Sequence, residues 1–245
     1  MKFRYENDII TLCIVLIILL MILECNAKAD DTINDDCLDP SGYTWLETPT
    51  REAILIGRIA DGIQRVKGDH FYVCGEKLDK IEKEKYSIKL AYMIVKNGYD
   101  INPWGLAGTM ANESGFDYCA LGLNPRKWAV NYGLLEEKKM SISYKRSEIL
   151  NVINDDHAKD VFAHSGFDLG LCQMLTKYYL SEYEKPEDLL TVYKGIDICI
   201  NKMNEKAYKY DTRRPWRWWR GSETDWYDKK ITKWARRMGA RIGEI

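Results

Sequence analysis

The segment of residues 102–116 constrains the fold most. Pro103 is well placed to open a helix, because Pro is favoured at the first helical position. Apolar and small residues then recur at positions i, i+3, i+4 and i+7, namely Trp104, Ala107, Gly108 and Ala111. This spacing predicts a helix with one apolar face. The helix is expected to end at Glu113, with Gly115 as the stop.

The carboxyl group of Glu113 stands where that apolar run stops. Apolar neighbours and the negative end of a helix dipole both favour the neutral form of a carboxyl group. A neutral carboxyl group can serve as a general acid. Helix ends also carry carboxylates for ordinary reasons, so the position is informative only together with a second motif.

The second motif is Gly-Phe-Asp-Leu-Gly-Leu-Cys-Gln at residues 166–173. With Glu-Ser-Gly-Phe at 113–116, it resembles the goose-type lysozyme and lytic transglycosylase superfamily, whose marks are Glu-Ser-x-Phe followed by Gly-Leu-Met-Gln. With Asp two residues before Gly170, the motif resembles that of the specialised transglycosylases of secretion and conjugation systems. Cys172 stands in the place of the Met.

The resemblance implies a mainly α fold in the lysozyme-like α+β class, with a small sheet or loop region. It implies glycosidic bond cleavage by a single acid, Glu113, without cofactor or metal. Ser114 matches a residue that helps position substrate or acid, and Gln173 matches one that lines the cleft. Gly170 is expected to let the backbone approach the sugar closely.

Asp168 admits two interpretations. It is either a second carboxylate of the site or a brace for the turn at Gly170. An inverting pair of carboxyl groups lies about 6.5–9.5 Å apart, a distance that sequence does not give.

Trp218 and Trp219 lie where related enzymes carry a late Ala-Tyr-Asn-x-Gly segment, whose Tyr sits beside the catalytic Glu. That Tyr-Asn pair is missing here. Each Trp is either a platform for a saccharide ring or part of the core.

The rest of the chain predicts further helices and one domain. We expect helices over residues 50–66 and 77–96, one starting at Pro186, and a last one starting at Thr224 and Asp225. The last helix carries an apolar face that includes Trp226 and Tyr227. Residues 50–245 form the domain. A helical insertion at about 125–163 lies either at the rim of the cleft or in solvent as a spacer.

The N-terminal part indicates export. Residues 9–23 are nearly all apolar, short for a membrane span and typical of a signal peptide, and Ala27-Lys28-Ala29 offers a cleavage site. Residues 1–29 are therefore a signal peptide or an uncleaved anchor, and residues 30–49 are an extended leader. The protein is expected to be periplasmic or extracellular.

Five cysteines follow residue 29, and an exported chain can form disulfides. The odd number leaves at least one thiol unpaired. We expect Cys172 to be the free one, as a small buried apolar side chain in the Met position. The preferred pairing is Cys37 with Cys74 and Cys119 with Cys199, although four cysteines allow three connectivities.

Charge limits the partners. The net charge of −1 gives no general attraction to nucleic acid. Residues 202–245 carry 13 Lys and Arg against 6 Asp and Glu, which is either a surface for anionic polymer or membrane, or a solvated face.

The leading functional expectation is a lytic transglycosylase that cuts peptidoglycan glycan strands for a secretion, conjugation or phage assembly. A non-catalytic wall-binding component and a hydrolytic muramidase are the alternatives.

Overall fold

A computed structural model describes residues 50–97, 101–138, 143–180, 184–219 and 223–245. The predicted signal peptide or anchor, the leader and Cys37 lie outside these residues. Ile54–Ile245 form one compact unit. Its structure is mainly helical with small two-stranded sheets, as the sequence predicts.

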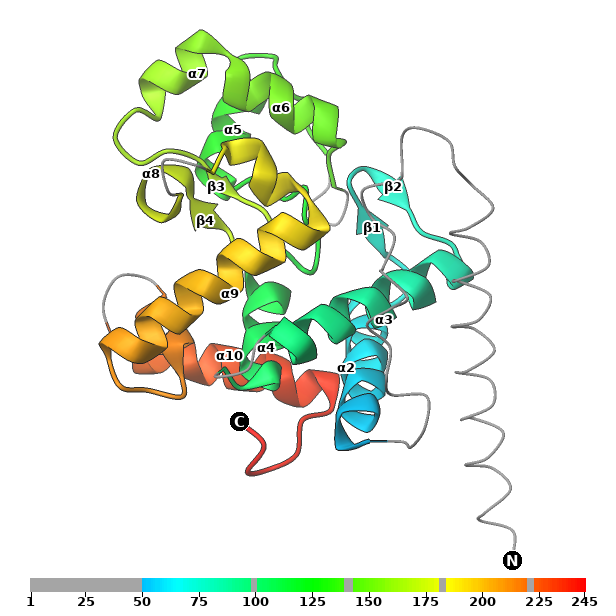
Figure 1. Ribbon diagram of the computed structural model, residues 1–245. Coiled ribbons are helices and arrows are strands. Elements are labelled where there is room, and N and C mark those ends of the chain that lie inside the picture. The colour runs from blue at the N-terminus through cyan, green and yellow to red at the C-terminus, as the bar shows by residue number, and fades with distance from the viewer. Residues whose placement is uncertain (1–49, 98–100, 139–142, 181–183, 220–222) are drawn as a thin grey trace, which may run out of the picture. The chain divides into compact units, whose positions relative to one another are not determined.

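Helix α4 (Pro103–Glu113) is the buried centre of this unit (Figure 1). Every residue from position 104 to 111 is buried, so the helix contacts protein on all sides. Its limits follow local signals. The side chain of Asn102 accepts hydrogen bonds from the amides of Trp104 and Gly105, and Pro103 occupies the first turn. The predicted end at Glu113 is confirmed.

Helix α10 (Asp225–Met238) packs against α4 and runs in the opposite direction, since Tyr227 contacts Glu113 and Ile231 contacts Gly108. Gly108 makes this packing close, because a Cβ atom there would lie 2.8 Å from the carbonyl oxygen of Ile231. The predicted start of α10 is confirmed. Its predicted apolar face is wrong at Trp226, whose side chain is 58% exposed.

Three longer helices surround this pair: α2 (Arg51–Lys67), α3 (Lys80–Asn97) and α9 (Val192–Lys209). Helix α3 begins later than predicted, because Asp79 caps it by accepting hydrogen bonds from the amides of Ile81 and Glu82. The helix predicted from Pro186 is divided in two. The 3-10 helix η4 (Pro186–Leu190) comes first, and Thr191, in extended conformation, separates it from α9.

The sheets are two antiparallel pairs. Strands β1 (Tyr72–Val73) and β2 (Glu76–Lys77) form one, and β3 (Asp168–Leu169) and β4 (Met174–Leu175) form the other. Strand β3 lies within the second motif, and β4 follows the motif directly. The turn between these two strands holds residues 170–173.

The region of the predicted insertion contains α5 (Leu123–Asn131), α6 (Arg146–Asn154) and α7 (Asp156–Val161). Figure 1 shows them grouped near β3 and β4 and away from α10. They bury side chains in the main core, among them Ala129, Ile149, Val152 and Ala158. A purely solvated spacer would not do this. Helix α8 (Thr176–Tyr179) and the 3-10 helix η5 (Pro215–Trp218) complete the fold.

The predicted disulfide pairing is wrong. The bonds are Cys74–Cys119 and Cys172–Cys199, so Cys172 is not a free thiol. The physical reason is tertiary: the turn after β3 lies against the buried face of α9, which brings the Cα atoms of Cys172 and Cys199 to 6.2 Å. The two disulfides indicate an oxidising compartment.

No helix among the described residues has both the length and the apolar character needed to cross a membrane.

Candidate active site

Backbone hydrogen bonds join the second motif to the loop that follows the first motif. The loop after Glu113 runs alongside β3, where Leu121 forms a bridge with Leu169. The amide of Gly122 donates to the carbonyl of Asp168 at 2.8 Å, and the amide of Gly170 donates to the carbonyl of Ala120 at 3.0 Å. Residues separated by about 50 positions in the chain thus form one local structure.

Gln173 strengthens this connection. Its side-chain nitrogen donates to the carbonyls of Ala120 and Gly170, both at 3.1 Å. Its φ of +48° lies in the left-handed region, and its own amide bonds to the Gly170 carbonyl. These contacts give Gln173 a structural role in the turn, whether or not it also contacts a ligand.

The Glu113 carboxyl group is half-buried and held from two helices. The phenol of Tyr227, on the buried side of α10, donates to Oε1 of Glu113. The side-chain nitrogen of Asn112 donates to the same oxygen at 2.9 Å. Both contacts fix the orientation of the carboxyl group.

Directly after Glu113 the chain reverses. Gly115 and Phe116 have φ values of +60° and +65°, and a left-handed conformation is costly for a bulky residue such as Phe. Phe116 is fully buried, and its carbonyl accepts a hydrogen bond from the phenol of Tyr86 at 2.6 Å. The Ser114 hydroxyl donates to the carbonyl of Met110 at 3.1 Å, so it caps α4.

Asp117 anchors the loop that follows. One oxygen of its buried carboxyl group accepts the amides of Cys74 and Cys119, at 3.0 and 2.9 Å. Burial raises the pKa of Asp117, against the opposing effects of these hydrogen bonds and of nearby Lys67. The Cys74 and Cys119 sulfur atoms lie close to this carboxyl group, but their disulfide makes them unsuitable as thiolate metal ligands.

Asp168 and Gly170 are positioned by neighbouring backbone. A Cβ atom on Gly122 would lie 2.5 Å from the Cβ of Asp168, so these two residues are in tight contact. Gly170 has a φ of +75°, and a Cβ atom there would collide with the carbonyl oxygen of Leu189. The backbone of Leu189 therefore lies where a side chain on residue 170 would have to be.

The two tryptophans differ. Trp219 is buried, donates from its indole nitrogen to the carbonyl of Cys172 at 3.1 Å, and stacks on Tyr179. It therefore packs against the second motif. Trp218 is half-buried and stacks face to face on Tyr210, with ring centroids 3.8 Å apart.

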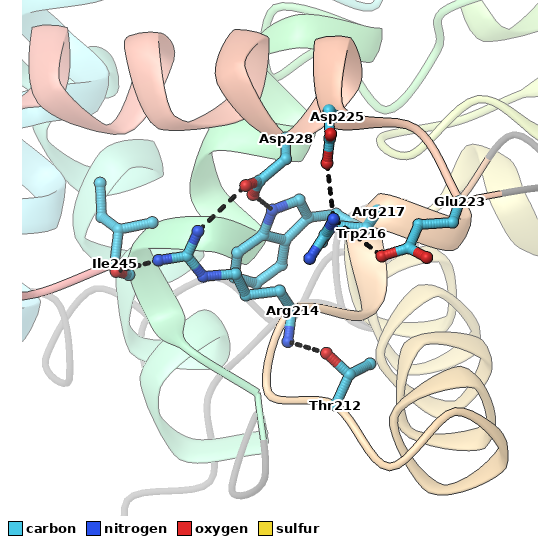
Figure 2. A network of polar contacts seen from close by, with 8 residues as sticks. All are labelled: Thr212, Arg214, Trp216, Arg217, Glu223, Asp225, Asp228 and Ile245. Carbon is cyan, nitrogen blue, oxygen red and sulfur yellow. Dashed lines mark hydrogen bonds and ion pairs between the residues drawn. The ribbon is translucent and has the colours of Figure 1, made fainter.

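A polar network beside α4 supports the site (Figure 2). The ring of Trp216 lies over Gly105 of α4, and its indole nitrogen donates to Asp228 at 2.8 Å. Arg214 donates to the other oxygen of Asp228 at 3.0 Å and to the main-chain oxygen of Ile245 at 2.8 Å. Asp228 follows Tyr227, so this network fixes the part of α10 that reaches Glu113.

Sequence reasoning missed the role of Tyr227. The resemblance predicts a Tyr beside the catalytic Glu, but in the segment before the last helix, where residues 216–220 are all Trp or Arg. The available signal was the place of Tyr227 on the apolar face of that helix. The hydroxyl group of a buried Tyr usually has a hydrogen-bond partner.

We compared the chain with known proteins. No family model matches it, no curated protein matches it, and no solved structure matches it.

Proposed function

We propose that the protein cleaves peptidoglycan glycan strands, with Glu113 as the single acid of a lytic transglycosylase reaction. The observation that carries this proposal is the half-buried carboxyl group of Glu113 at the end of a central helix, oriented by the Tyr227 phenol. The loop after Glu113 supports the proposal as well, because its residues Ala120 and Gly122 are hydrogen-bonded to the second motif.

The proposed chemistry needs one proton donor. Glu113 protonates the glycosidic oxygen, and the bond from that oxygen to the muramyl C1 breaks as positive charge develops on the sugar. The resulting carboxylate then takes the proton of a hydroxyl on the same sugar, whose oxygen attacks C1 and closes an anhydro ring. If water attacks in place of that hydroxyl, the product is a reducing end and the enzyme is a muramidase.

The cellular setting of the proposal is the space outside the cytoplasm. The disulfides favour an oxidising compartment, and residues 9–23 have the composition of a signal peptide. Local opening of the wall for a secretion, conjugation or phage assembly is the role that the resemblance suggests.

The test is mass analysis of purified peptidoglycan after incubation with the protein. We expect anhydro-muramyl ends from the wild type. Glu113→Gln should lose cleavage by at least about 10²–10⁴-fold, because it removes the transferable proton. Glu137→Gln is the matched control, since Glu137 is exposed and far along the chain from both motifs. Near wild-type cleavage by Glu113→Gln would contradict the proposal.

A non-catalytic wall-binding protein is the second candidate. The favouring observation is that Glu113, Ser114 and Gln173 all make hydrogen bonds within the protein, as purely structural residues would. In that case the wild type should cosediment with insoluble peptidoglycan and release no product.

A further inference from the structure

The outer side of α10 carries a basic hollow of about 710 Å³. Six cationic side chains line it: Arg214, Lys229, Lys233, Arg236, Arg237 and Arg241. Asp228 is the single acidic residue among the lining residues. This basic hollow is separate from the proposed catalytic residue, because Tyr227 reaches Glu113 from the buried side of the same helix.

The negative charge of Asp228 is already compensated. One carboxyl oxygen accepts the indole N–H of Trp216, and the other pairs with Arg214 (Figure 2). Arg214 is thereby held in place as well. The charge that the hollow offers to a ligand comes from the other five cations.

Those five side chains are exposed. Four of them, at positions 229, 233, 236 and 237, follow the i, i+4, i+7, i+8 spacing of one helix face. Among the described residues, none of these four forms an ion pair with a carboxylate. Arg237 lies over the ring of Trp234 at 4.9 Å, which restricts its guanidinium group.

Helix stability does not account for this arrangement. The helix dipole favours cations in the last turn, where Arg236 and Arg237 lie. It does not favour Lys229 and Lys233 in earlier turns, and like charges four residues apart repel each other. An extended anionic ligand would compensate all of them together.

The geometry also limits the ligand. From position 229 to 237 the row of cations covers about 12 Å at 1.5 Å per residue, which is longer than a single phosphate group. Arg241, beyond the end of the helix, adds a cation from another direction. Guanidinium groups bind phosphate oxygens in a bidentate manner, and the tetrahedral phosphate presents oxygens to several sides. The lining residues include no aromatic ring on which a nucleic acid base could stack.

We propose that the basic hollow binds a linear polyol phosphate, a polyanion with repeated phosphodiester groups and no aromatic bases. The site would hold the protein on an anionic polymer independently of cleavage at Glu113.

The experiment measures binding of the full chain to fluorescently labelled poly(glycerol phosphate) by anisotropy at several salt concentrations. Lys229→Gln with Lys233→Gln should weaken binding by at least about tenfold and lower the salt slope by about two, because two phosphate contacts are lost. Lys127→Gln with Lys230→Gln removes the same charge from exposed positions outside the hollow, and should leave affinity within about twofold of the wild type. Thermal melts show whether all variants fold. Glu113→Gln should bind like the wild type, so loss of cleavage and loss of binding are separable.

Four results would overturn the proposal. They are absence of saturable binding, equal weakening in both double variants, equal affinity for single-stranded DNA or polygalacturonate, and binding to vesicles with anionic lipid without binding to the polymer. The last result would identify a membrane-docking surface.

Discussion

Tyr227 donates the hydrogen bond that fixes Glu113, although 114 positions separate the two residues. The contact depends on the antiparallel packing of α4 against α10. Gly108 lets the two helices approach closely at Ile231. Tyr227 lies one turn before Ile231 on α10; its ring is fully buried, and its hydroxyl group donates to Oε1 of Glu113. A Tyr thus lies beside the candidate acid, but it comes from the last helix.

Tyr227→Phe removes this hydrogen bond and keeps the ring. If Glu113 is the acid, cleavage should fall about 10–100-fold, since hydrogen bonds to charged groups contribute about 1.5–3 kcal/mol. Turnover of peptidoglycan and thermal melts measure the two effects. Tyr208→Phe, at a residue 92% exposed, is the control. Unchanged turnover in Tyr227→Phe would show that the phenol does not assist the acid.

Asp168→Asn distinguishes the two interpretations of Asp168, a brace for the turn at Gly170 or a second carboxylate of the site. Asp168 lies against Gly122 with its main-chain oxygen, its Cβ atom and its carboxyl group, and Asn keeps this shape while it removes the charge. We expect cleavage to fall less than about tenfold, well below the loss in Glu113→Gln. A loss equal to that of Glu113→Gln in folded protein would indicate a mechanism with two carboxylates.

Trp219→Ala and Trp218→Ala should separate stability from binding. Trp219 is buried against Cys172 and Tyr179, so its truncation should cost about 3–5 kcal/mol of unfolding free energy. Trp218 is half-buried, and its truncation should cost less while lowering affinity for wall fragments. Denaturant titration and glycan titration by Trp fluorescence provide the two measurements. If both variants melt and bind normally, neither ring has the role assigned to it.

Local signals in the sequence predicted α4 well. Asn102, Pro103 and Gly115 act within one or two turns of the helix ends, so their effect does not depend on the rest of the fold. The mainly α class was expected from similar helix patterns along the chain and from the resemblance. The joining of the two motifs was inferred only through the resemblance, and Gly122 and Ala120, which make the connection, carry no distinctive signal.

The disulfides and Tyr227 depend instead on tertiary packing. Spacing along the chain does not reveal that the turn at Cys172 lies against Cys199 of α9, so the pairing was mistaken. Likewise, the apolar face of the last helix was recognised, but only its contact with α4 shows that Tyr227 points to Glu113 and that Trp226 faces solvent.

Replacing Cys172 and Cys199 together by Ser should lower the unfolding free energy by about 2–5 kcal/mol, because the bond closes a loop between residues 27 positions apart. Denaturation of the wild type and the double variant measures the loss. Peptide mapping without reduction should find Cys172 linked to Cys199. A free Cys172 thiol in the folded protein would contradict the structure.

The pair of Arg58 and Glu244 should make stability depend on pH in the acid range. The two terminal guanidinium nitrogens of Arg58, Nη1 and Nη2, donate to the two carboxyl oxygens of Glu244, at 2.7 and 2.8 Å. The hydrogen bonds from Arg58, against the opposing effect of burial, lower the pKa of Glu244 from 4.5 to about 2. Since the folded pKa is the lower one, the stabilisation is present above about pH 4.5 and is lost as the pH falls toward 2.

Glu244→Gln should therefore lower the unfolding free energy near neutral pH by up to about 1 kcal/mol, because the partly exposed Arg58 loses its carboxylate partner. The difference from the wild type should shrink steadily between pH 4.5 and about 2, since over this range Glu244 binds a proton in the unfolded chain before it does so in the folded protein. Urea titrations at a series of pH values measure this difference, and Glu137→Gln, at an exposed residue, should show none. A constant difference between Glu244→Gln and wild type at all pH values would mean that the charge of Glu244 contributes nothing, and that its effect comes from packing of the chain end alone.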